Sequence, residues 1–198
     1  GTGGAVVVMD VTDGSIVALS SYPTFTPTTF VGGITQDELD LLQSSAAFSP
    51  LLNRAIQGTY PAASTYKTFT GLAALENGMA TATETWDCTG SWDGFGSGDV
   101  QKCWKKQGHG TLDFRGGIVN SCDTVYYDIG YKFWDAAANK GKSATLLQDF
   151  LKRYRLDQTT GIDLNGETSG RIPTPEWKQE YFRDTPEDAQ WKGGDYTN

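Results

Sequence analysis

The sequence feature that most constrains the fold is a serine and a lysine placed three residues apart before an apolar run. Ser64 and Lys67 directly precede the apolar residues 69–75. If this stretch begins a helix, the spacing puts both side chains on one helix face. A neutral lysine amine can then take the proton of the serine hydroxyl and make it a nucleophile. The pair therefore predicts a helix-borne nucleophile, and the alternative is an ordinary start of a surface helix.

Composition places the chain among globular proteins and argues against two kinds of partner. Of its 198 residues, 38% are hydrophobic and 24 are glycine, which fits a compact domain with many tight turns. The net charge of -8 argues against a nucleic-acid surface and an anionic membrane patch. Neither a membrane helix nor a signal peptide is visible, so we expect one domain whose targeting segment has been removed.

Periodicity and turn residues predict a mixed α and β chain. Two runs rich in β-branched residues, 5–10 and 15–20, flank Asp13 and Gly14 and predict a β-hairpin with a two-residue turn. Residues 80–110 lack periodicity, and so long a loop in a compact domain needs other support. Helices are expected over 36–44, over 64–77, from Thr111 or Asp113 toward Asn120, through Val125, Ile129 and Phe133, through Leu147 and Leu151, and over 176–181.

Ser121 and Asp123 form a second polar pair between two of the expected helices. Taken alone, such a pair is better explained by helix capping. Acyl transfer by a serine–lysine pair also needs a second hydroxyl to relay a proton to the leaving amine, and a polar group to hold the lysine. Next to Ser64 and Lys67, Ser121 fits the relay and Asp123 fits the orienting group.

All three cysteines and the only histidine fall between positions 88 and 122, as Cys88, Cys103, His109 and Cys122. Three thiolates and one imidazole make a closed tetrahedral zinc set, which would also support the loop. A disulfide with one leftover thiol and a set of free thiols stay open as alternatives. Because an odd number of cysteines disfavours the disulfide, we expect a structural zinc ion and no organic cofactor.

Six ordered segments of the chain resemble class B penicillin-binding proteins. The serine–lysine spacing is a signature of penicillin-binding proteins, although class A β-lactamases share it. Together the segments look like the elongation-specific transpeptidase of the penicillin-binding protein 2 type, with similarity from about Ala5 onward. The six segments are 53–61, 64–67, 104–110, 121–124, 160–164 and 169–174.

This resemblance implies an α+β fold of the penicilloyl-serine transferase, or β-lactamase-like, class, in which an antiparallel sheet packs with helices. We expect residues 1–198 to be the N-terminal portion of a single transpeptidase domain, so that the fold is incomplete in this chain. The membrane helix, the pedestal and the Lys-Thr-Gly part of the family would then lie outside it. Two departures are local: Ala62 and Ala63 replace the more usual Pro-Gly, and Asp123 stands where many relatives carry asparagine.

The function implied by the resemblance is a peptidoglycan D,D-transpeptidase. Lys67 would deprotonate Ser64, which would attack the D-Ala-D-Ala end of a stem peptide, and Ser121 would protonate the leaving D-alanine. β-Lactams would acylate the same serine. Further implied partners are a cell-wall glycosyltransferase and other elongation-complex proteins, at the extracytoplasmic face of the bacterial cell membrane. Relatives carry metal-capable residues at the positions of the cysteine and histidine set.

Three alternatives differ from a transpeptidase in chemistry. A β-lactamase would share the nucleophile but hydrolyse its acyl-enzyme, and the Glu-x-x-Leu-Asn segment that class A enzymes use for this step is missing from the sequence. A non-catalytic β-lactam sensor or binding module would stay acylated. A metal-stabilised interaction fragment would have no activity. We expect the transpeptidase for the natural parent protein.

Overall fold

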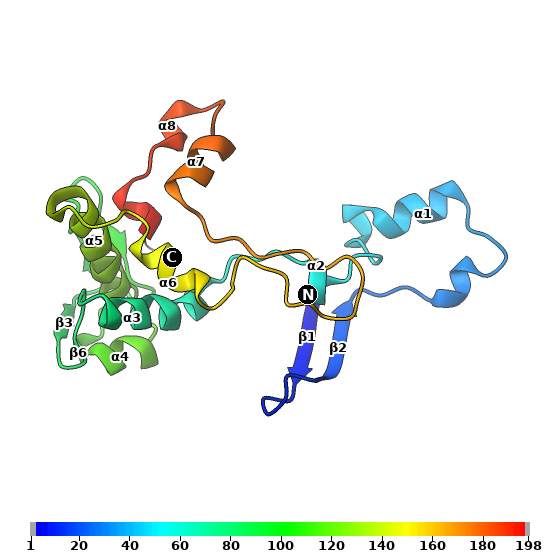
Figure 1. Ribbon diagram of the computed structural model, residues 1–198, viewed down its shortest axis with the longest axis horizontal. Helices are drawn as coiled ribbons and strands as arrows, with labels where there is room; N and C mark the ends of the chain where they lie inside the picture. The colour runs from blue at the N-terminus through cyan, green and yellow to red at the C-terminus, as the bar shows by residue number, and fades with distance from the viewer. Residues whose placement is uncertain (1–2, 197–198) are drawn as a thin grey trace. The chain divides into compact units, whose positions relative to one another are not determined.

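The computed structural model describes residues 3–196 as two compact units (Figure 1). One unit is formed by the described part of Gly1–Tyr60 together with Thr159–Gly170. The other is formed by Pro61–Gln158 together with the described part of Arg171–Asn198. Among residues 3–196, no helix has both the length and the apolar character needed to cross a membrane. The assignment of 1–198 to a single domain stays a prediction.

The first unit begins with the predicted β-hairpin, whose turn is longer than expected. Strands β1 (Gly4–Met9) and β2 (Ile16–Tyr22) pair antiparallel. The predicted two-residue turn is wrong, because the loop runs from Asp10 to Ser15. The Asp10 carboxylate accepts a hydrogen bond from the backbone N–H of Thr12 at 2.8 Å, and the Asp13 carboxylate accepts one from Ser15 at 2.8 Å. These side-chain bonds replace strand pairing with local turns.

The rest of the first unit is irregular and carries two helices. Helix α1 (Gln36–Gln43) was predicted, and it starts at a capping box in which Thr35 and Glu38 bond each other's backbone. Helix α2 (Arg54–Gln57) follows Asn53, whose side chain caps it. Single 3₁₀ turns occupy Pro27–Phe30 and Ser45–Ala47. Many apolar side chains of the hairpin are exposed, and the buried hydrophobic residues among 3–196 all belong to the second unit.

The second unit contains most of the helices. The helices expected there are confirmed, and only their ends differ from the expectation, by a few residues. Helix α5 begins one residue after Cys122, and Gly141 ends it in the left-handed conformation. Helix α8 and a final 3₁₀ turn were not expected. The elements are a 3₁₀ turn (Ala63–Tyr66), α3 (Lys67–Glu76), α4 (Phe114–Val119), α5 (Asp123–Lys140), α6 (Leu146–Lys152), α7 (Pro175–Tyr181), α8 (Pro186–Ala189) and a 3₁₀ turn (Gly193–Tyr196).

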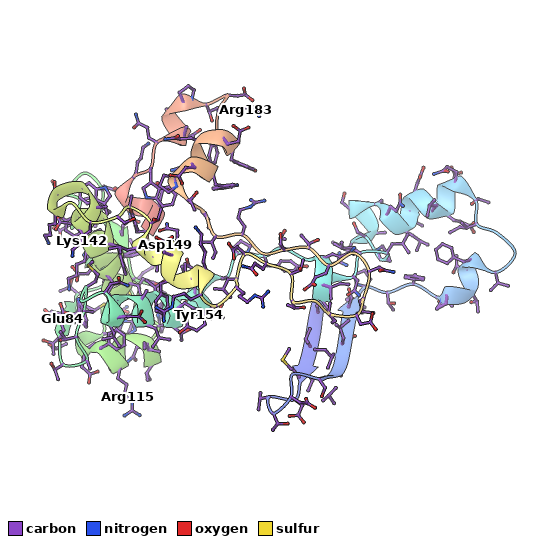
Figure 2. The ribbon with its side chains drawn as sticks, in the orientation of Figure 1. Glu84, Arg115, Lys142, Asp149, Tyr154 and Arg183 are labelled. Carbon is purple, nitrogen blue, oxygen red and sulfur yellow. The ribbon has the colours of Figure 1, made fainter. Side chains whose placement is uncertain are left out.

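The core of this unit lies where α3 packs against α5 and against α6 (Figure 1). Ile129 and Phe133 on α5 are buried one turn apart, as their spacing predicts. Leu151 on α6 is fully buried, and Gly71 on α3 leaves room for the ring of Phe114. Charged side chains such as Arg115 on α4 point away from the ribbon (Figure 2). The apolar faces of the helices therefore meet, and their polar faces remain in water.

Residues 80–110 were expected to lack regular elements, but they contain three short strands. A fourth strand begins at the end of this stretch and pairs with the first of the three. Strand β3 (Thr85–Cys88) pairs antiparallel with β6 (Gly110–Asp113), and β4 (Ser91–Trp92) with β5 (Gln101–Lys102). The expectation is wrong because strands of two to four residues are too short for alternation to be visible. The nested pairing brings the two ends of the segment back together.

Truncation of a buried leucine should separate core packing from surface contacts. Leu151→Ala should lower the free energy of unfolding by about 2–5 kcal/mol, since Leu151 is fully buried on α6. The matched control is Leu72→Ala on α3, where the leucine is 48% exposed and a change within about 0.5 kcal/mol is expected. Chemical denaturation of both variants measures the difference. Equal losses would contradict the difference in burial between Leu151 and Leu72.

Candidate active site

Lys67 is a buried lysine at the first position of α3, only 3% exposed. Its Nζ lies 2.5 Å from Asp123 Oδ1, 3.0 Å from the backbone oxygen of Ser121 and 3.3 Å from Ser121 Oγ. An ammonium group has three N–H donors, so these acceptors match its donors in number. The Tyr126 ring lies 5.6 Å from Nζ, and burial raises the pKa of its hydroxyl to about 12. The lysine is therefore held in one position by satisfied polar contacts.

The corner between α4 and α5 supplies two of these contacts. Ser121 occupies the left-handed region with φ 47°, which is uncommon for a residue other than glycine. This conformation reverses the chain, so that both the carbonyl and the hydroxyl of Ser121 bond Lys67. Backbone strain of this kind is often found at functional sites. Asp123 starts α5, where the positive end of the helix dipole favours a carboxylate.

The second oxygen of Asp123 is also bound. Asp123 Oδ2 accepts a hydrogen bond from the backbone N–H of Trp104 at 2.8 Å. The indole Nε1 of Trp104 donates to the backbone oxygen of Asn120 at 3.1 Å. The sequence placed Trp104 in one of the family-like segments without a role of its own. Its position directly after Cys103 was the signal that could have identified it.

Ser64 lies in the 3₁₀ turn that precedes α3, and its side chain is exposed. The residue before it, Ala63, has φ 49°, a conformation that glycine adopts more easily. Across residues 3–196, no hydrogen bond joins Ser64 to the Lys67 amine. The structure thus brings Lys67, Ser121 and Asp123 together and leaves Ser64 one turn away from the lysine.

The three cysteines and the histidine converge in the second unit. One ligand atom from each of Cys88, Cys103, His109 and Cys122 lies within 4.8 Å of all the others. His109 Nδ1 is 3.5 Å from Cys88 Sγ and 3.6 Å from Cys103 Sγ. In a tetrahedral zinc site with Zn–S about 2.3 Å and Zn–N about 2.0 Å, neighbouring sulfur and nitrogen ligands lie roughly 3.5 Å apart. The residues therefore fit a zinc ion in both chemistry and spacing.

The thiols are buried and free, so no disulfide joins any of the three cysteines. Burial acts to raise the pKa of the Cys88 thiol, but hydrogen bonds with Thr124 and His109 outweigh it and lower that pKa. Burial raises the pKa of the Cys122 thiol, and the neighbouring Cys88 and Cys103 also raise it. A divalent cation would favour the thiolate form of such a crowded set.

Two glycines allow the loops of this cluster to approach each other. Gly108 has φ 78°, and a Cβ there would lie 2.0 Å from the backbone oxygen of Cys88. Gly90 has φ 96°, and a Cβ there would lie 2.1 Å from the backbone oxygen of Lys106. Only glycine fits both the conformation and the space. The backbone N–H of His109 then donates to the oxygen of Cys88 at 3.0 Å.

The penicillin-binding protein transpeptidase domain family matches residues 4–188 of the chain. The peptidoglycan D,D-transpeptidase MrdA of Escherichia coli K12 is 36% identical over 195 residues, and so is MrdA of Haemophilus influenzae. These alignments cover 98% of this chain and 28% of each relative. The chain therefore spans little more than a quarter of the length of the curated relatives.

Solved structures give the same result for the fold. Pseudomonas aeruginosa PBP2 in complex with WCK 5153 matches with a TM-score of 0.80 and 29% identity, over 99% of this chain and 41% of that one. Helicobacter pylori PBP2 in complex with MreC matches with a TM-score of 0.81 and 31% identity, over 98% of this chain and 33% of that one. The family and the transpeptidase fold predicted from the six segments are confirmed.

Removal of Asp123 should reveal how strongly the buried lysine depends on it. Asp123→Ala should lower the free energy of unfolding by about 3 kcal/mol, because a buried ammonium would lose its counter-charge. The double variant Lys67→Met with Asp123→Ala should recover most of that loss, since no charge is left buried. Urea denaturation of the three proteins measures both steps. A single variant as stable as the parent would contradict the importance of the ion pair.

Proposed function

Because the chain belongs to the penicillin-binding protein transpeptidase domain family, we propose that the protein carrying it is a peptidoglycan D,D-transpeptidase. The observation that supports this most directly is the contact of Lys67 with Ser121 and Asp123, one helical turn after Ser64. This arrangement offers a nucleophile, a base and a proton relay, which acyl transfer requires.

In the proposed acylation, Ser64 is the nucleophile and Lys67 its base. Lys67 acts as the base once its ammonium group has given up a proton, and the amine then takes the Ser64 proton as Oγ attacks the carbonyl carbon between the two D-alanines of a stem peptide. The tetrahedral intermediate then breaks its C–N bond, and D-alanine leaves with a proton delivered through Ser121. Ser121 Oγ lies 3.3 Å from the lysine amine, within reach for that relay. The product is an ester between the peptide and Ser64.

In the proposed second step, an amine from a neighbouring stem peptide attacks this ester. The new amide bond crosslinks two peptides, and Ser64 regains its proton. The backbone N–H of Ser64 supplies one oxyanion donor. Asp123 acts as the orienting group, since it holds the Lys67 amine at 2.5 Å. A β-lactam mimics the D-Ala-D-Ala end and acylates the same serine.

A labelled penicillin should identify the nucleophile. In the full-length protein, incubation should add the mass of one penicilloyl group, and peptide mapping should place it on Ser64. Ser64→Ala should abolish the adduct, because Ser121, the other hydroxyl beside Lys67, acts in this mechanism as the proton relay and not as the nucleophile. The matched control is Thr65→Ala, which removes the neighbouring hydroxyl that donates to Ala62 and should keep the adduct.

Two results of this experiment would favour other functions. An adduct that disappears within minutes, with release of hydrolysed penicillin, would indicate a β-lactamase. A stable adduct on a protein that does not crosslink stem peptides would indicate a β-lactam-binding module. A folded full-length protein that forms no adduct would contradict the transpeptidase and leave a metal-stabilised interaction module as the better account.

We also propose that Cys88, Cys103, His109 and Cys122 hold one structural Zn²⁺ ion. Support comes from their convergence within 4.8 Å, the burial of the thiols and the closed donor set, which leaves no position for substrate. The bound ion would supply a fixed positive charge. It would thereby link the strand segment, residues 85–113, to the start of α5. No bond-making step requires it.

Metal content and thiol counting test this site together. We expect one zinc per chain, a lower melting temperature after chelation, and reduced zinc in Cys103→Ser. Thr89→Ala, which removes an exposed hydroxyl beside Cys88, serves as the control and should keep the metal. After denaturation with a chelator and without reductant, all three cysteines should react with a thiol reagent. A single reactive thiol would indicate the disulfide instead.

The partners and location of the full-length protein are further proposals. Helicobacter pylori PBP2 has been solved with MreC, and another similar structure, 29% identical, is that of a peptidoglycan synthase complex. By analogy with these relatives, we propose a cell-wall glycosyltransferase and elongation-complex proteins as partners. The substrate is cell-wall peptide, so we place the domain at the extracytoplasmic face of the bacterial membrane.

A further inference from the structure

Trp104 is an exposed aromatic residue that is nevertheless held on three sides. The residue is 64% exposed. Its backbone N–H donates to Asp123 Oδ2 at 2.8 Å, and its indole Nε1 donates to the oxygen of Asn120 at 3.1 Å. Its ring meets that of His109 edge-on, with centroids 5.3 Å apart. A tryptophan that buries so little surface adds little to core packing. Core packing therefore does not explain why Trp104 is held in a fixed position.

The two hydrogen bonds of Trp104 bracket Ser121. One reaches Asn120, directly before the serine, and the other reaches Asp123, two residues after it. The preceding residue, Cys103, is itself fixed, because its backbone N–H donates to the oxygen of Gly90 at 3.0 Å. The Trp104 amide is therefore anchored to the strand segment on one side and to the start of α5 on the other.

We propose that Trp104 is a positioning residue of the acylation reaction, whose backbone N–H orients the Asp123 carboxylate toward Lys67. This inference rests on the proposed function. The carboxylate of Asp123 is 22% exposed, so its free rotation would allow water to compete for either oxygen. With Oδ2 held by Trp104, Oδ1 stays at 2.5 Å from the Lys67 amine. The indole bond to Asn120 keeps the amide in place.

The rate of acylation by benzylpenicillin, measured on the full-length protein, tests this role. The maximal acylation rate constant and the dissociation constant of the non-covalent complex are determined separately. Trp104→Ala keeps the backbone N–H but removes the indole bond and the ring that hold this N–H in place. It should lower the rate constant about fivefold, roughly the value of one neutral hydrogen bond, and leave the dissociation constant unchanged. Trp104→Phe keeps the ring and the amide but loses the indole donor, and should lower the rate constant by a smaller factor.

A double-mutant cycle separates positioning from a general structural effect. Once Asp123→Ala is in place, Trp104→Ala should cause no further loss of rate, because the amide has no carboxylate left to orient. The control is Tyr181→Ala on α7, a ring exposed to a similar degree, 61%, whose removal should not change the rate constant. Circular dichroism establishes that each variant is folded.

Three outcomes would overturn the proposal. Variants at Trp104 that acylate as fast as the parent would show that the residue does not position Asp123. A raised dissociation constant with an unchanged rate constant would make Trp104 a ligand contact. Fully additive losses of rate with Asp123→Ala would make its role purely structural. If the parent protein itself fails to react, the proposed function fails first, which distinguishes the two.

Discussion

The buried contact between Lys67 and Asp123 is the interaction on which the candidate site depends. It joins the first residue of α3 to the first residue of α5, so the helices that form the core also set the distance between amine and carboxylate. Removing an ammonium from water costs several kcal/mol, and only a nearby counter-charge with full hydrogen bonding offsets that cost. Packing and site geometry therefore constrain each other: a shift of either helix would leave a buried charge without a partner.

The cysteine and histidine cluster also constrains the positions of Ser121 and Asp123. Cys122 lies between Ser121 and Asp123, and Cys103 lies beside Trp104, which binds Asp123. The cluster is thus connected to the residues that contact Lys67 in two ways. Cys122 adjoins Ser121 and Asp123 along the chain, and Cys103 adjoins Trp104, which is hydrogen-bonded to Asp123. Residues 80–110 have few buried apolar side chains of their own. A metal or an equivalent network of bonds at this point would support the segment and the proposed relay together.

Local sequence was a sound guide where one residue type decides the local structure. The spacing of Ile129 and Phe133 predicted α5, Asp113 caps α4, and Gly78, with φ 69°, follows the end of α3. Local sequence was a poor guide where contacts beyond neighbouring residues determine the structure. The strands from β3 to β6 exist because segments far apart in the chain pair, and the hairpin turn is long because the side chains of Asp10 and Asp13 bond the backbone.

The amino-acid sequence by itself determined the family, the helices and the set of candidate residues, because spacing and residue type are local properties that survive without coordinates. It placed Ser64, Lys67, Ser121, Asp123 and the four cluster residues in two groups. Only the tertiary structure decided that Lys67 meets Asp123, since a pair more than fifty residues apart along the chain meets through helix packing. It alone also revealed Trp104, because that residue bonds Asp123 through its backbone N–H, a group that every residue except proline carries.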